Sequence, residues 1–154
     1  ENPALFVQEH SKYDGIAAFG TEQLGKIRET IPVVEARSII LYFATPPMDD
    51  PAITHTRPYH VISHILGHES PGSLHALLLQ EGLINDLCSG VGVDTSDFSL
   101  CNLSLSMTPK GMANKQQVLD LVWQYIALIK NTMITDDDND RMAKYHDEMR
   151  DISR

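Results

Sequence analysis

Cysteine is scarce in this sequence. The two cysteines, Cys88 and Cys101, are too few for the disulfide framework of a small secreted domain. They fall on neighbouring predicted strands, so a bridge between them is geometrically conceivable. Because no secretory signal opens the chain, we expect free buried thiols in a reducing compartment and favour the cytoplasm.

Positive charge is also under-represented. The chain has 12 Lys and Arg against 21 Asp and Glu, which gives a formal net charge of −9 at pH 7. Contacts with phosphates need clustered Lys and Arg, so the charge argues against nucleic acid as a partner. No apolar run approaches the roughly 18–20 residues of a transmembrane helix, and we expect no membrane partner.

Internal repeats are absent, and the short acidic run Asp136–Asp140 is the only segment of low complexity. A length of 154 residues suits one domain with a core of its own. The first residue is not methionine, and residues 151–154 continue a helical pattern without a stop signal. We therefore expect a piece excised from a longer protein.

The stretch Arg57–Leu83 has the strongest helical pattern. His60, His64 and His68 recur every four residues, so on a helix they would share one face, where two imidazoles can reach one metal ion. The alternative is a set of hydrogen-bonded histidines without metal, because a zinc site needs a third ligand from elsewhere. Ser70 and Pro71 suit the start of a second helix, and Gly82 suits its end.

The remaining pattern predicts an α+β domain. We expect a central strand over residues 33–45, apolar on both faces, and an antiparallel hairpin over residues 84–94 and 97–108. Gly90 and Gly92 indicate a bulge or a close backbone approach in the hairpin's first strand. Helices are expected over residues 115–131, with Asn114 or a neighbour as the cap, and over 138–154. Residues 23–28 read as a short strand or extended arm, and 1–22 as a linker or irregular arm.

Two motifs carry a family resemblance. HxxGH at residues 64–68, followed by ESPGSL, and the φ-T-x-x-G pattern of Met107–Gly111 resemble the second half of the insulin-degrading enzyme and pitrilysin family of zinc metalloproteases, peptidase family M16. The resemblance implies a two-layer sandwich with a mostly antiparallel sheet and helices on one face. Residues 23–154 would be a partial half-unit of this kind, truncated at its C-terminal end.

The family's active motif is HxxEH, in which the glutamate deprotonates a zinc-bound water. Gly67 replaces this base, and Glu69 cannot take its place because two residues turn a helix by roughly 200°. We therefore expect no catalytic residue and no metal in this segment. His64, His68 and Glu148 (or its neighbour Asp147) are vestigial ligand candidates that the resemblance implies.

The resemblance implies a segment of the inactive, chamber-forming half of a peptide-degrading zinc metalloendopeptidase. Zinc would belong to the N-terminal catalytic half of the same chain, which is its partner, and the segment alone would not be an enzyme. Two alternatives stay open: a non-enzymatic scaffold or partner subunit of the family, and an independent metal-binding module using His60, His64 and His68. The family's substrate-contacting residues lie beyond Arg154, so none is assigned. A homodimer of the segment is also expected, because truncation leaves sheet edges uncovered.

Overall fold

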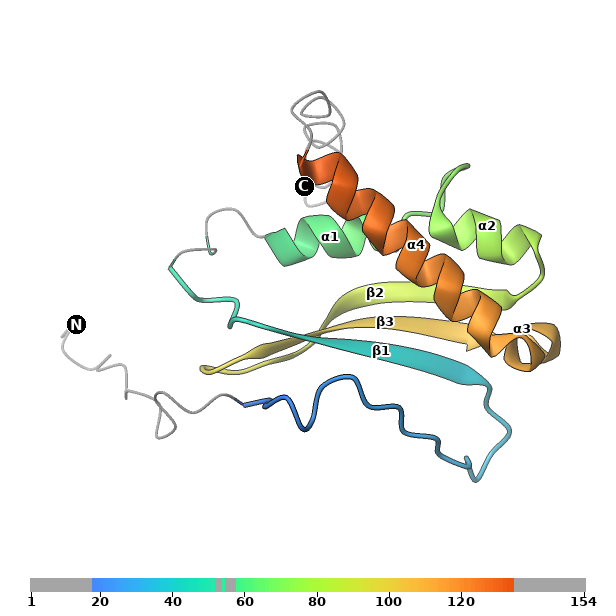
Figure 1. Cartoon of the computed structure of the whole chain (residues 1–154), viewed down its shortest axis with the longest axis horizontal. Coiled ribbons are helices and arrows are strands. Elements are labelled where there is room, and N and C mark those ends of the chain that lie inside the picture. Colours follow the sequence, from blue (N-terminus) through green and yellow to red (C-terminus); the bar gives the residue numbers. More distant parts are fainter. Residues whose placement is uncertain (1–17, 52–53, 55–57, 135–154) are drawn as a thin grey trace, which may run out of the picture.

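The structure is a computed structural model that describes residues 18–51, 54 and 58–134. The described strands and helices follow one another in the order predicted from the sequence, with one additional short helix, α3 (Figure 1). The elements are β1 (Ser38–Thr45), α1 (Pro58–Leu66), α2 (Leu74–Gln80), β2 (Ile84–Asp94), β3 (Ser99–Met107), α3 (Pro109–Ala113) and α4 (Lys115–Ile134). None of the described helices is long and apolar enough to cross a membrane.

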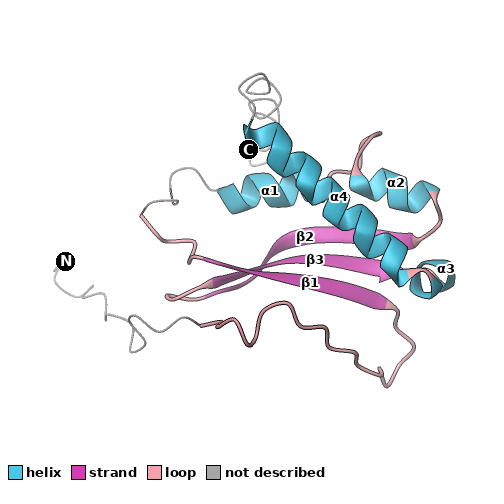
Figure 2. Cartoon of the chain, viewed as in Figure 1, coloured by secondary structure: helices cyan, strands magenta, loops and turns pink. Residues whose placement is uncertain are grey.

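The strands form an antiparallel sheet in the order β1-β3-β2. Helices α1, α2 and α4 all lie on one side of this sheet (Figure 2). The predicted α+β class, with helices on one face of an antiparallel sheet, is therefore confirmed.

The prediction of a central strand over residues 33–45 is wrong in two respects. The strand begins at Ser38, since β3 ends at Met107 and offers no partner to residues before Arg37. It also lies at the edge of the described sheet, where Ile40 and Tyr42 are exposed while their neighbours face the helices. An apolar sequence on both faces did not distinguish an edge from a centre. That distinction depends on β3, which pairs with both other strands.

The predicted hairpin is confirmed. Strands β2 and β3 pair antiparallel, and the register shifts between Val91 and Val93. The shift falls at Gly92, where an added Cβ would lie 3.2 Å from Nδ2 of Asn102. A side chain would crowd Asn102 of the neighbouring strand, which is a steric reason for glycine at this shift.

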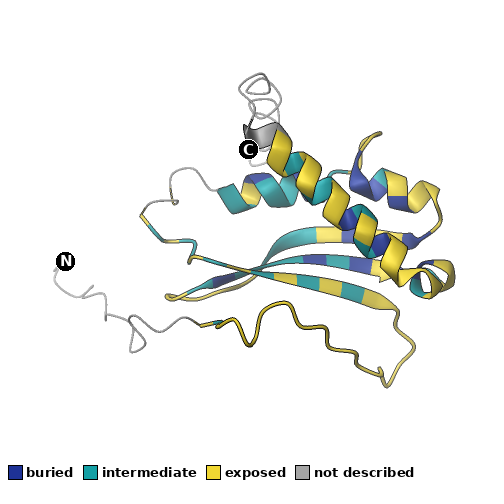
Figure 3. Cartoon of the chain, viewed as in Figure 1, coloured by how far each residue is buried: buried dark blue, intermediate teal, exposed yellow. Residues whose placement is uncertain are grey.

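The core lies between the sheet and the helices (Figure 3). Alternate residues of β3 face the helices, and the apolar stripes of α2 and α4 pack against them. The fully buried side chains of this core are Leu74, Leu78, Leu83, Ile84, Leu103, Leu105, Met107, Val118 and Val122.

The start of α2 differs from the prediction. Ser70 and Pro71 precede the helix in a turn, in which Ser73 N–H donates to the Ser70 carbonyl and Gly72 has a φ of 90°. The helix cap is Ser73, whose side chain accepts the N–H of Ala76 at 3.1 Å. Ser70 and Ser73 are both suitable N-cap residues. The positive φ of Gly72 is not helical, so the helix starts after Ser73, three residues later than predicted.

The end of α2 agrees with the prediction. Gly82 has a φ of 65°, its N–H donates to the Leu79 carbonyl, and Leu83 N–H donates to the Leu78 carbonyl. These two bonds form a Schellman motif, which satisfies carbonyls that the helix end leaves open. The buried side chains of Leu78 and Leu83 supply the apolar contact that accompanies this motif.

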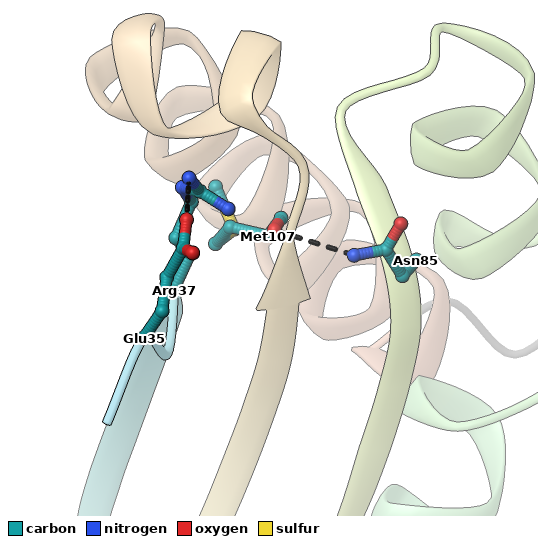
Figure 4. A network of polar contacts seen from close by, with 4 residues as sticks. All are labelled: Glu35, Arg37, Asn85 and Met107. Atoms are coloured by element: carbon teal, nitrogen blue, oxygen red, sulfur yellow. Dashed lines mark hydrogen bonds and ion pairs between the residues drawn. The ribbon is translucent and has the colours of Figure 1, made fainter.

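The turn at Thr108 is hydrogen-bonded to the turn that ends α2. Thr108 N–H donates to the Leu83 carbonyl at 3.1 Å, and Thr108 Oγ1 lies 2.8 Å from the Gly82 carbonyl oxygen. The same hydroxyl oxygen accepts the N–H of Gly111 and thereby caps α3. We call Gly82, Leu83, Thr108 and Gly111 the clamp, because they join the start of β2 to the end of β3, two strand ends that Figure 4 shows side by side.

Helix α4 covers the predicted range and runs on to Ile134. The side chain of Asn114 donates to the Lys110 carbonyl, at the end of α3. It does not act as the side-chain cap that was predicted at the start of α4. Residues 23–28 form no strand: a turn covers Thr21–Gly25, and the segment after it has no regular structure up to β1. The helix predicted over 138–154 and most of the arm predicted over 1–22 lie outside the described residues.

Candidate functional site

Helix α1 positions the histidine motif. Pro58 stands at its first residue, where the missing N–H costs no hydrogen bond. Val61, Ile65 and Leu66 are buried and fasten the helix to the layer of the sheet, mainly against β2. This leaves His64 half-buried on a flank of the helix, near β2.

Two of the three predicted histidines lie together. The ring centroids of His64 and His68 are 5.4 Å apart, with an angle of 67° between the rings. His68 lies two residues after Leu66, the last residue of α1, but the turn continues through Gly67, whose N–H donates to the Ser63 carbonyl at 2.9 Å. His60 lies one turn earlier and is exposed. Of the three histidines, the structure thus brings His64 and His68 together.

Gly67 leaves the site without the carboxylate of the HxxEH motif. A Cβ added here would lie 3.2 Å from the Ser63 carbonyl oxygen and 3.8 Å from Ser89 N on β2. Its φ is not positive, so the backbone itself would accept a side chain. A shallow, open pocket of about 300 Å³ lies beside it, with His64, Glu69 and Ser89 among its lining residues. Glu69 is exposed at the rim.

The orientation of His68 opposes zinc binding. Its Nδ1 accepts the backbone N–H of Ser70 at 3.0 Å. An accepting Nδ1 carries no proton, so in the neutral ring the proton is on Nε2. A histidine that binds zinc through Nε2 instead donates Nδ1–H to its neighbour. Binding through Nε2 would therefore require His68 to lose the Ser70 contact.

A third ligand is not found within the described part of the chain. No group of three or more His, Cys, Asp or Glu side chains there could hold a metal ion. Glu148 and Asp147, the residues named as the remaining ligand, lie outside this part. Zinc sites in proteins use at least three protein ligands, so His64 and His68 by themselves do not fit zinc.

Sequence reasoning missed an apolar pocket of about 410 Å³ between α1, α4 and the sheet. Phe43, Ile62, Leu66, Ile126 and Ile129 line most of it, together with the polar groups of Thr45, Tyr59 and Cys101. The sequence carried no signal that the elements leave a gap at this end, because the gap depends on how the helices cross the sheet.

Burial affects two ionisable groups in this pocket. It raises the pKa of the Tyr59 hydroxyl, an effect that a hydrogen bond with Thr45 partly opposes. Burial likewise raises the pKa of the Cys101 thiol, whose Sγ lies 3.8 Å from Oγ1 of Thr45. The thiol therefore stays protonated, and a protonated thiol is a poor nucleophile. Both cysteines are free, as predicted, although Cys88 is exposed rather than buried.

Comparison with known proteins identifies related sequences. The family described as "Peptidase M16 inactive domain" matches residues 13–144. The A-factor-processing enzyme of Saccharomyces cerevisiae is 30% identical over 112 residues, and the insulin-degrading enzyme of Drosophila melanogaster is 23% identical over 112 residues. Each match covers 73% of this chain and 11% of the relative. A protein of Caenorhabditis elegans called a putative zinc protease is 26% identical, covering 74% of this chain and 13% of that protein.

The fold also has a counterpart among solved structures. A crystal structure of pitrilysin superposes with a TM-score of 0.61 at 23% sequence identity, over 71% of this chain and 12% of the pitrilysin chain. The present chain therefore spans about a tenth of the length of the relatives that it matches.

Proposed function

Because the chain belongs to the M16 peptidase family, where it matches the inactive domain, we propose that it is part of the chamber-forming, non-catalytic half of an insulin-degrading-type zinc metalloendopeptidase. Residues 23–154 would be a partial unit of that half, and residues 1–22 a linker. The parent protein would degrade peptides. Zinc and the proton-transferring glutamate would belong to the N-terminal catalytic half of the same polypeptide.

The observation that carries this proposal is Gly67. Helix α1 and the turn that continues it position the motif, and His64 and His68 lie side by side, yet Gly67, at the place of the base, has no side chain. Loss of a general base typically lowers a rate by 10²–10⁴-fold. The accepting Nδ1 of His68 gives an independent reason why the same helix would not hold zinc well.

What remains for such a half is confinement. A wall that closes over a separate active site excludes water and holds a peptide in a productive position, which raises the rate without contributing a reacting group. The layer of α1 on β2 suits a wall, because the buried side chains of Val61, Ile65 and Leu66 hold the helix against the sheet. We also propose a reducing, cytoplasmic compartment on the basis of the two free thiols.

Hydrolysis assays test the central claim. The purified chain should release only background fluorescence from a library of quenched fluorogenic peptides, with or without added zinc. The matching genetic test is the complete reading frame, which should encode an intact HxxEH upstream. Turnover by the pure chain that a chelator abolishes would refute the assignment of this segment as inactive. An upstream sequence without HxxEH would favour a scaffold subunit of the same family.

Calorimetry separates the remaining alternative, an independent metal-binding module. Zinc titrated into the chain should give no saturable one-to-one isotherm, since His68 is held in the wrong tautomer for binding through Nε2. Stoichiometric binding that His60→Ala, His64→Ala and His68→Ala each weaken would support the module instead.

A further inference from the structure

We draw no further inference here: the strongest candidate, the apolar pocket of about 410 Å³ that α1, α4 and the sheet form beside Tyr59 and Cys101, carries none, because nothing in the described part of the structure shows what fills or covers it in a chain that spans about a tenth of the length of its relatives.

Discussion

Replacing Gly111 with alanine should destabilise the fold far more than its place in a short surface helix suggests. A Cβ at this position would lie 1.8 Å from the Leu83 carbonyl oxygen and 2.7 Å from its carbonyl carbon. Both atoms belong to the backbone, so no side-chain rotation can relieve the overlap. To admit the methyl group, α3 must move away from the start of β2, and the clamp must open.

The magnitude follows from the bonds of the clamp. Thr108 bonds to the carbonyls of Gly82 and Leu83 through its N–H and its hydroxyl, and Lys110 Nζ donates to the Glu81 carbonyl at 2.5 Å. The Thr108 hydroxyl has a single proton, so about three bonds are lost, and at about 1 kcal/mol each this lowers the free energy of unfolding by about 3 kcal/mol. Alanine recovers about 1 kcal/mol through its higher helix propensity. We expect a net loss of about 2 kcal/mol, or roughly 4–8 °C in Tm.

Urea denaturation followed by Trp123 fluorescence measures this loss. Gly90→Ala is the matched control, because it is the same chemical change at a glycine whose added Cβ would have nothing within 4 Å. That control should keep or raise the stability, by up to about 1 kcal/mol, since glycine within a strand is unfavourable relative to alanine. A loss below about 1 kcal/mol for Gly111→Ala, or an equal loss for both variants, would refute the steric explanation.

Two other substitutions have defined outcomes. Gly67→Glu should change the free energy of unfolding by less than about 1 kcal/mol, because the backbone accepts a side chain and the nearest atom to an added Cβ is 3.2 Å away. The variant should bind zinc more tightly yet hydrolyse little peptide. A loss of stability above about 2 kcal/mol would mean that β2 packs directly on this position. Hydrogen bonds from the Ser99 hydroxyl and from Met48 N–H lower the pKa of the Asp94 carboxyl. The ionised carboxylate therefore stabilises the fold above the ordinary aspartate pKa of about 3.9, and this stabilisation disappears as the pH falls through the lowered pKa. The urea midpoint of Asp94→Asn should therefore fall less than that of the parent protein as the pH is lowered. An identical pH dependence of the midpoint in both proteins would contradict this reasoning.

The parts of the fold that sequence reasoning predicted correctly have local signals. The hairpin over residues 84–94 and 97–108 and the helix over 115–131 each depend on side chains a few positions apart, and both appear where expected. Gly82 was predicted as the end of α2, because a left-handed residue at a helix end is most often glycine. The φ-T-x-x-G pattern placed Gly111 in a turn, but only the structure shows that Leu83, far away in the sequence, forbids a side chain there.

The errors arose where the outcome depends on contacts distant in sequence. Whether β1 is central or at an edge depends on β3, which lies more than fifty residues later. Ser70 and Ser73 are equally good caps, and the backbone of Gly72 between them decides the choice. At the histidine motif, the spacing predicted that the three histidines would share one face of a helix. The proton position on His68 depends on a contact with Ser70 that spacing does not show.

The clamp also bears on the order in which the chain folds. Its two halves, Gly82–Leu83 and Thr108–Gly111, are about 25 residues apart in sequence, a separation that carries a substantial loop-closure entropy in an unfolded chain. Once β2 and β3 have paired, the two ends of the hairpin lie side by side, and the clamp becomes a short-range contact. We infer that the hairpin forms before the clamp, and the clamp before α4 is held against the sheet. The amide of Thr108 should then be among the slowest to exchange with deuterium, because its hydrogen bond breaks only when the two halves of the clamp separate.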